Sequence, residues 1–296
     1  MNLPEYFVDS INRQYGEETA ARIFAGMAGK RRVSLRVNRL KAEPTDVEKA
    51  LTDNGISFER LPWWEDAFLL TEALESDIWK LPIYEQGGVY LQSLSSMLPP
   101  LALEPQAGAD LLDMAAAPGG KTAQMASMTG NRANITACEI NRIRAEKLQY
   151  NLQKQGATRV NVMVRDARKL EDFFRFDQVL LDAPCSGSGT MLACDARTTR
   201  AFSEKLVRNS AATQLQLLKK ALTLLKSGGT MVYSTCSILE MENENVVKAA
   251  LKGVKAVIEP IQIPDLPLLP ASLPGAICVC PTDSYEGFFM AKIRKE

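Results

Sequence analysis

The sequence predicts an α/β protein in which a mainly parallel sheet is covered by helices on both faces. From about residue 108, short apolar segments alternate with longer segments whose apolar residues recur every three or four positions. Such alternation favours a parallel sheet, because each connecting helix packs on a face while the chain returns to the next strand. The 296 residues, 46% of them hydrophobic and 24% charged, allow one large domain or a medium and a small one.

The first part of the chain predicts a small α/β module over residues 1–90. Helix formers, alternating apolar residues and glycine stops predict two short helices within 1–28, a strand at 32–38, a helix at 45–55 and strands at 57–61 and 67–71. Acidic residues near the N-terminus argue against a secretory signal. A short strand and a helix within 87–103 then lead into a second domain, residues 91–296.

The second domain carries the regular alternation. Its first five strands are predicted at 110–114, 134–140, 159–167, 176–185 and 230–236. Helices are predicted at the end of 115–128, at 141–156, through 211–225 with a stop at Gly228 and Gly229, and at 242–253. Closing strands are predicted at 255–261, 276–282 and 287–295.

The composition excludes several classes of protein. The chain has no histidine, and its six cysteines form no CxxC pair, so we expect no metal site. No apolar run approaches the roughly 18 residues of a membrane helix, and a disulfide framework is not expected in a cytosolic chain of this size. We therefore expect a cytoplasmic monomer whose chemistry does without the commonest general base.

Four successive strand ends carry signals of a bound ligand, which in open α/β sheets lies beyond the carboxyl ends of the strands. After the first strand comes "AAAPGGK" (115–121), whose small residues let the backbone approach a ligand closely. Glu139, Asp166 and Asp182 end the next three strands. Any one acid could be a loop residue or a helix cap, but the four together favour a nucleoside cofactor. Because GxGxxG is missing, S-adenosylmethionine is favoured over a dinucleotide.

The motifs at these strand ends also resemble a known family. In order they read "DMAAAPGGKT", "CEI", "VRDAR", "LLDAPCSGSGT", "YSTCSI" and "ENENVV", preceded by "LRVN" and "GGVYLQSLSSMLPP". Over about residues 30–296 this series resembles the Nop/Sun family of RNA cytosine-C5 methyltransferases. The resemblance implies a Rossmann-like class I methyltransferase fold with a seven-stranded, mainly parallel sheet and an N-terminal RNA-contacting module. It implies RNA, either rRNA or tRNA, as substrate and S-adenosylhomocysteine as the product formed from the cofactor.

The resemblance also assigns the cofactor site. The residues that we expect to hold S-adenosylmethionine are Ala115, Ala116, Ala117, Pro118, Gly119, Gly120, Lys121, Glu139, Arg144, Asp166 and Asp182. The family usually has Cys where Ala115 stands and Thr where Ser188 stands, and both replacements are small. We expect no extra RNA-binding domain after residue 296, so the resemblance does not choose between rRNA and tRNA.

Cys185 and Cys236 each follow a predicted strand, at positions that suit covalent catalysis. Carbon 5 of cytosine is a poor nucleophile until a thiolate adds at carbon 6 and turns the ring into an enamine-like species. A second group must then remove the proton from carbon 5. If the first, fourth and fifth strands of the second domain are neighbours, both thiols face one pocket, into which the target base must leave its stack.

Chemistry alone does not say which thiol attacks, because DNA cytosine methyltransferases use a Pro-Cys thiol like that of Cys185. In the family that the sequence resembles, the Thr-Cys thiol attacks. The resemblance therefore implies that Cys236 is the nucleophile, that Cys185 assists elimination and that Asp182 contacts the cytosine. Lys121 is expected to contact either the cofactor or the base.

A basic stretch in the first module is the expected contact for the RNA backbone. The net charge is zero, yet 29–41 holds six basic residues and no acid, namely Lys30, Arg31, Arg32, Arg36, Arg39 and Lys41. An ordinary solvated strand edge is the alternative interpretation. If the stretch binds RNA, affinity should fall steeply with salt, and removing the charges of Arg36 and Arg39 should weaken that dependence.

Two other functions are compatible with the fold class. An amino-group methyltransferase would need no thiol, but such enzymes usually have an aromatic residue where "DAPC" has Cys185. A catalytically silent RNA-binding or ribosome-assembly factor could keep the cofactor fold without turnover. The completeness of the motifs favours the cytosine methyltransferase over both.

Overall fold

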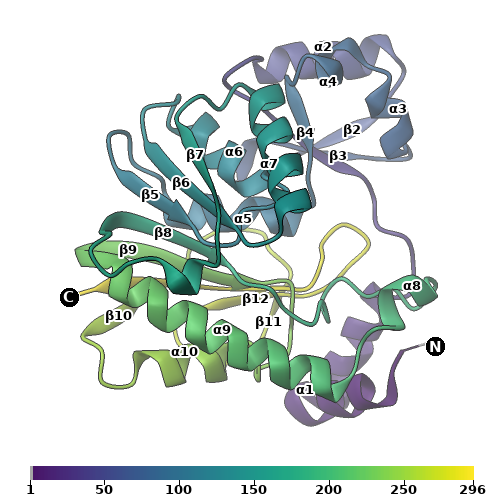
Figure 1. The fold of residues 1–296 in the computed structure, drawn as a ribbon. Helices are drawn as coiled ribbons and strands as arrows, with labels where there is room; N and C mark the ends of the chain where they lie inside the picture. The colour runs from purple at the N-terminus through teal and green to yellow at the C-terminus, as the bar shows by residue number, and fades with distance from the viewer. Residues whose placement is uncertain (1–2) are drawn as a thin grey trace.

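The structure, a computed structural model that describes residues 3–296, contains two β-sheets (Figure 1). The smaller sheet has the order β2-β3-β1-β4 and antiparallel pairing throughout. Its strands are β1 (Ser34–Val37), β2 (Phe58–Leu61), β3 (Trp64–Leu70) and β4 (Val89–Leu91). Three helices accompany it, α2 (Pro44–Asp53), α3 (Glu75–Trp79) and α4 (Pro82–Glu85). Every element predicted between residues 32 and 71 is confirmed.

The larger sheet has the order β11-β12-β13-β9-β8-β5-β6-β7, with β10 paired to β13. The strands are β5 (Asp110–Asp113), β6 (Asn134–Glu139), β7 (Val160–Val164), β8 (Phe176–Asp182), β9 (Leu225–Thr235), β10 (Ala256–Glu259), β11 (Leu268–Leu269), β12 (Ile277–Val279) and β13 (Phe288–Lys295). The helices are α1 (Glu5–Gly26), α5 (Leu94–Leu103), α6 (Gly120–Met128), α7 (Arg142–Gln155), the 3₁₀ turn η1 (Ala167–Lys169), α8 (Ala196–Thr199), α9 (Glu204–Leu224) and α10 (Glu244–Leu251).

The predicted α/β class and the predicted adjacency of β5, β8 and β9 are confirmed. Strands β5 to β9 pair in parallel, whereas β10 to β13 add antiparallel pairs, so the sheet has nine strands instead of the expected seven. The segment 280–287 that joins β12 to β13 is too short for a crossover, which leaves antiparallel pairing as the available geometry.

Alternate side chains of the central strands build two cores on opposite faces of the large sheet, as the twofold repeat of a strand requires. Leu111, Leu180 and Val232 pack with α5 and α6 on one face. Leu112 and Leu181 pack with α1, α9 and α10 on the other. Because helices cover both faces, the strand ends are the exposed part of this sheet. None of the helices described over residues 3–296 combines the length and the apolar character that crossing a membrane requires.

Helix α1 belongs to the N-terminal segment but packs on the large sheet. Its backbone breaks at Gly16, where φ is 75°, and this divides it into the two short helices that the sequence predicted. The Phe7 ring meets the Phe202 ring edge-on at a centroid distance of 5.7 Å. The small sheet lies at the upper right of Figure 1, while α1 lies below beside α9.

Helix α9 ends earlier than predicted. Its C-cap Leu225 already has extended dihedral angles, and β9 starts there. Gly228 and Gly229 therefore lie inside a strand, beside a shift in the register with β8 between Phe176 and Gln178. A Cβ on Gly229 would lie 2.7 Å from the Asp177 carbonyl oxygen, so glycine is required by this close approach of two backbones.

Candidate active site

The carboxyl ends of β5, β8 and β9 meet at one edge of the sheet and bring the two motif cysteines together. The loop after β8 carries Cys185, and the loop after β9 carries Cys236. Their sulfur atoms lie 3.0 Å apart. The pocket shared by both thiols, which the strand order predicted, is therefore present.

Two clefts open on either side of this cysteine pair. The first, which we call the lysine cleft, measures about 510 Å³ and is lined by Lys121 and by residues of both sheets. The second, the glutamate cleft, measures about 320 Å³ and is lined by Glu139 and the ends of β6, β7 and β8. Residues that line both clefts are Ala115, Ala117, Asp182 and Cys236. Cys185 lines only the glutamate cleft. Cys236 thus lies where the two clefts meet.

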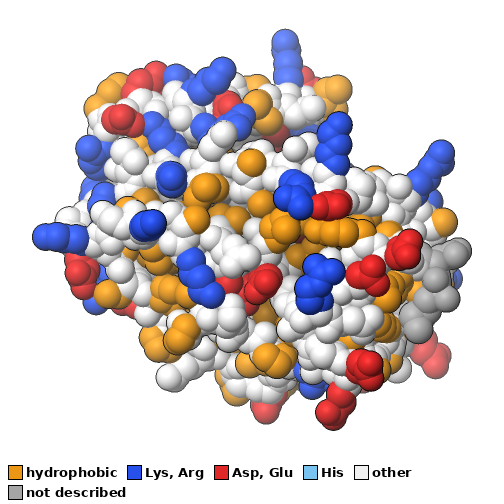
Figure 2. Space-filling model, turned by 90° about the horizontal axis from the view of Figure 1, so that it is seen from below, with side chains coloured by type: hydrophobic (Ala, Val, Ile, Leu, Met, Phe, Trp, Pro, Cys, Tyr) orange, Lys and Arg blue, Asp and Glu red, His pale blue; other side chains and the backbone are white. Residues whose placement is uncertain are grey.

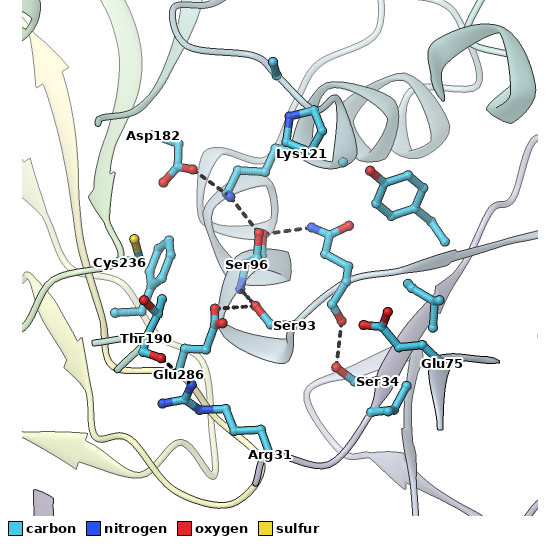
Figure 3. Close-up of a pocket in the computed structure, with 18 of the residues that line it drawn as sticks. Arg31, Ser34, Glu75, Ser93, Ser96, Lys121, Asp182, Thr190, Cys236 and Glu286 are labelled. Atoms are coloured by element: carbon cyan, nitrogen blue, oxygen red, sulfur yellow. Dashed lines mark hydrogen bonds and ion pairs between the residues drawn. The ribbon is translucent and has the colours of Figure 1, made fainter. Parts of the chain in front are cut away.

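A partly buried ion pair between Lys121 and Asp182 lines the lysine cleft. The Lys121 ammonium lies 2.8 Å from Asp182 Oδ2 and donates to Ser96 Oγ at 2.6 Å, as Figure 3 shows. Burial lowers the pKa of Lys121, but the adjacent Asp182 carboxylate outweighs this effect and the net shift is upward. Ser234 donates to the other Asp182 oxygen at 2.8 Å. The ammonium therefore stays charged beside the Cys236 sulfur, and Asp182 is held in one orientation.

Sequence reasoning missed Ser96 and Ser234, which orient this ion pair. Both stand inside quoted motifs, "SLSSM" and "YSTC". A serine carries no distinctive spacing signal, so only the contacts identify its role.

Asp113, at the end of β5, is a buried carboxyl in the wall of the lysine cleft. Thr122 Oγ1 donates to its Oδ2 at 2.6 Å. Burial raises the pKa of Asp113 to about 6, and the nearby Asp182 carboxylate contributes to the rise. Because this pKa lies above that of an unfolded chain, Asp113 costs stability above about pH 6 and costs almost none below about pH 4.

This shift predicts a pH-dependent effect of Asp113→Asn on stability. The variant should gain stability relative to the wild type as the pH rises, by about 2 kcal/mol between about pH 4 and pH 7, since its amide cannot ionise. Chemical unfolding of both proteins across this range measures the difference. A difference that stays constant with pH would show that Asp113 titrates normally in the folded protein.

The glutamate cleft offers acceptors suited to a nucleoside. Glu139 is buried, and its Oε1 accepts from the Asn141 amide at 2.8 Å. Its Oε2 lies 3.3 Å from Arg144, whose other terminal nitrogen donates to the Ala117 carbonyl at 3.0 Å. Hydrogen bonds from Arg168 hold the pKa of Asp166 below its usual value. The cleft thus combines carboxylates for hydroxyl and amino donors with apolar walls that include Ile140 and Leu217. These residues fit S-adenosylmethionine.

The loop 115–121 does not face one cleft only. Ala116, Pro118, Gly120 and Lys121 line the lysine cleft and are missing from the wall of the glutamate cleft. Gly119 lines neither, because it turns towards α7, where a Cβ would lie 2.9 Å from Leu148 Cδ1. Its φ of 109° and this close packing explain the glycine without a ligand.

Three residues of the basic stretch are not free surface cations. The predicted RNA contact at Arg36 is wrong, because Arg36 is fully buried and donates to the Gln92 side chain at 2.9 Å and to the Gly120 carbonyl at 3.0 Å. Arg39 is enclosed by carboxylates of Glu43, Glu65 and Asp66. Lys41 donates to the carbonyls of Gln86 and Lys154. The alternation of apolar and polar residues in the sequence could not predict these hydrogen-bond and ion-pair partners.

Arg31 and Arg32, by contrast, line the lysine cleft, and Lys30 beside them is exposed. Arg31 donates to the carbonyls of Gly189, Thr190 and Tyr285, as Figure 3 shows for Thr190. Basic and acidic side chains are interspersed on the face in Figure 2, consistent with the zero net charge. Within residues 3–296, no three His, Cys, Asp or Glu side chains group closely enough to hold a metal ion.

Two family models match this chain. One, described as 16S rRNA methyltransferase RsmB/F, covers residues 100–294, and the other, a ferredoxin-like domain of RsmF/B-like methyltransferases, covers residues 3–77. The chain belongs to the RsmB/F methyltransferase family. The predicted resemblance to the Nop/Sun RNA cytosine-C5 methyltransferases is thereby confirmed.

Individual RsmB/F relatives agree with this assignment. Ribosomal RNA small subunit methyltransferase F of Shewanella piezotolerans is 33% identical over 98% of this chain and 63% of its own length. Its counterpart in Aeromonas salmonicida is 36% identical over 89% of this chain and 58% of its own. The chain thus spans less than two thirds of the length of these relatives. The crystal structure of a methyltransferase homologue from Pyrococcus horikoshii matches with a TM-score of 0.81 and 33% identity, over 99% of this chain and 100% of that one. The class I methyltransferase fold is confirmed.

Proposed function

We propose that this protein methylates carbon 5 of a cytosine in small-subunit rRNA, with S-adenosylmethionine as methyl donor and a covalent adduct between Cys236 and carbon 6. The observation that carries the proposal is the place of Cys236, which lines both clefts, whereas Cys185, whose sulfur lies 3.0 Å from that of Cys236, lines only the glutamate cleft. A nucleophile at the junction of two clefts can hold a base from one cleft against a methyl donor from the other. The choice of rRNA rests on the names of the relatives.

We propose the glutamate cleft as the cofactor site, held by Glu139, Asp166 and Asp182 with the backbone of Ala115 and Ala117. Bound there, S-adenosylmethionine supplies an electrophilic methyl group. The protein positions its reacting end, because the residues common to both clefts form the boundary between cofactor and base. Arg144 acts on this boundary through its hydrogen bond to the Ala117 carbonyl.

The lysine cleft is the proposed site of the flipped cytosine. Asp182 accepts from the exocyclic amino group of the base, and the Lys121 ammonium balances its charge. The same ammonium offsets negative charge that develops on the ring when a thiolate adds. A uracil lacks the amino donor, so the Asp182 acceptor, which Lys121 and Ser234 hold in place, would discriminate against it.

We propose that residues 1–90 form an RNA-contacting module and residues 91–296 the methyltransferase domain. The separate small sheet within 34–91 supports this division, as does the presence of Arg31 and Arg32 in the wall of the lysine cleft. Both side chains come from the segment that joins α1 to β1. A cytoplasmic location and a monomeric state stay predictions from the sequence.

The placement of Arg32 predicts an electrostatic effect on RNA binding. Its guanidinium pairs with Glu59, whose side chain is 58% exposed, so the pair can open towards a phosphate at little cost. Arg32→Gln should weaken RNA binding and reduce the slope of log affinity against log salt by about 1. Filter binding across a salt series measures this slope. The control is Lys49→Gln on α2, which removes an exposed charge paired with Asp53, outside the wall of either cleft. Equal slopes for both variants and the wild type would remove Arg32 from the interface.

Bisulfite sequencing of rRNA and tRNA from cells with and without the protein tests the proposed function. We expect one or a few cytosines of small-subunit rRNA to lose protection when the protein is removed and to regain it on complementation. An amino-group methyltransferase would leave bisulfite protection at carbon 5 unchanged while a mass-shifted nucleoside disappears. A catalytically silent binding factor would change neither the bisulfite protection nor the nucleoside mass. Protection lost from tRNA alone would show that the substrate is tRNA and not small-subunit rRNA.

A further inference from the structure

A buried carboxylate lies behind the cysteine pair and contacts both cysteine loops. Glu242 follows β9 in the segment before α10, and none of its side chain is exposed. Its Oε1 accepts from the Ser186 amide at 2.7 Å, and its Oε2 accepts from the Ser186 hydroxyl at 2.5 Å and the Ser237 hydroxyl at 2.7 Å. Ser186 directly follows Cys185, and Ser237 directly follows Cys236. One side chain therefore spans the two residues next to the two thiols.

Further hydrogen bonds extend this link on each side. Gln214 of α9 donates to Glu242 Oε1 at 3.3 Å and to the Pro184 carbonyl at 3.0 Å, just ahead of Cys185. Because Ser237 donates to Glu242, the 2.8 Å contact between the Ser188 and Ser237 hydroxyls must run from Ser188 to Ser237. Ser188 in turn accepts from the Ile238 amide at 3.1 Å. The loops after β8 and β9 are thus connected through Glu242 and through each other.

Glu242 has hydrogen-bond donors around its carboxylate and no ion pair with a lysine or arginine of residues 3–296. Removing it would take an acceptor from the Ser186 amide and from the Ser186 and Ser237 hydroxyls, in the two loops that carry the cysteines, while Gln214 would keep only the Pro184 carbonyl. Fold stability alone does not require one carboxylate to accept hydrogen bonds from the residue after each of the two cysteines.

We propose that Glu242 is a positioning residue that fixes the separation and orientation of the Cys185 and Cys236 sulfur atoms. The catalytic consequence rests on the proposed function, whereas the geometric claim concerns this chain alone. Loss of Glu242 lets the loops drift apart, and a displacement of about 1 Å of reacting groups can cost about 100-fold in rate.

The geometric claim is tested by the thiol–disulfide equilibrium of the pair in glutathione buffers. Oxidised glutathione accepts two electrons and two protons from the two thiols, so one S–S bond forms between Cys185 and Cys236 and two glutathione thiols are released. Mass spectrometry of the linked peptides gives the equilibrium constant. For Glu242→Ala we expect that constant to fall about tenfold, which is about 30 mV in reduction potential.

Glu242→Gln keeps the shape of the side chain and replaces one acceptor oxygen with a donor, so we expect a smaller change in the same direction. It also serves if the alanine variant fails to fold, which thermal unfolding reports. The control is Glu244→Gln, since Glu244 is also buried but contacts the Ser272 amide instead of a cysteine loop. A wild-type equilibrium constant in folded Glu242 variants would overturn the proposal, as would an equal fall in the Glu244 variant.

Methyl transfer supplies an independent readout. The Glu242 variants should lose kcat by about 100-fold with the KM for S-adenosylmethionine nearly unchanged, because the cofactor residues of the glutamate cleft are untouched. If the wild type methylates no RNA, the proposed function fails, while the disulfide equilibrium still decides the role of Glu242.

Discussion

Cys236→Ala should abolish methyl transfer, with an expected loss of about 10⁴-fold or more in kcat, because the thiol that lines both clefts is removed. In the proposed mechanism the Cys236 thiolate would form a bond to carbon 6 of cytosine, and the electrons of the ring double bond would move to carbon 5. S-adenosylmethionine, if bound in the glutamate cleft, would supply the methyl group that carbon 5 accepts, and its sulfonium–methyl bond would break. Without the sulfur, carbon 5 stays too electron-poor to react.

Transfer of a labelled methyl group to small-subunit rRNA measures this loss. Binding of S-adenosylmethionine should be retained, since Cys236 contributes only part of the wall of the glutamate cleft. Cys194→Ala is the matched control, because Cys194 is exposed and lines neither cleft. Activity that survives in the Cys236 variant and is lost in the Cys185 variant would exchange the two roles.

Cys185→Ala traps a covalent complex between protein and RNA that survives denaturing electrophoresis. Contact with Cys236, burial and the nearby Glu242 carboxylate raise the pKa of Cys185 well above its ordinary value, so this group stays a thiol near neutral pH. At 3.0 Å the thiol can give its proton to the Cys236 sulfur as the carbon 6–sulfur bond breaks, and can regain the proton that leaves carbon 5. Without this exchange the methylated adduct persists.

We expect adduct release to slow by about 10² to 10⁴-fold, the range typical of a lost general acid–base group. The adduct should carry the transferred methyl group and should disappear in the double variant with Cys236→Ala. An adduct that forms through Cys185 in the Cys236 variant, together with rapid turnover in the Cys185 variant, would contradict this division of labour.

The sequence was a good guide where a signal is periodic or lies at a strand end. Alternating strands and helices gave the α/β class, and the order of β5, β8 and β9 placed Cys185 beside Cys236. Periodicity failed where burial depends on distant residues. Arg36 alternates like a surface residue, yet it is buried and donates to Gln92 and to Gly120 of the loop 115–121. The sequence pattern predicts a helix that starts at Glu242, whereas α10 starts at Glu244 and the Glu242 side chain accepts hydrogen bonds from both cysteine loops.

The amino-acid sequence by itself determined the chemistry available to this protein: two thiols, a lysine and carboxylates at the ends of parallel strands, and motifs specific enough to select a family. These signals are local, since a strand end or a tight loop is encoded within a few residues. Only the tertiary structure decided which sulfur reaches both clefts, which basic residues stay accessible and which carboxylate links the cysteine loops. Many of those facts depend on contacts between segments distant in the sequence, as with Cys185 and Cys236 at a separation of 51. Such contacts are determined by tertiary packing, and no local sequence pattern encodes them.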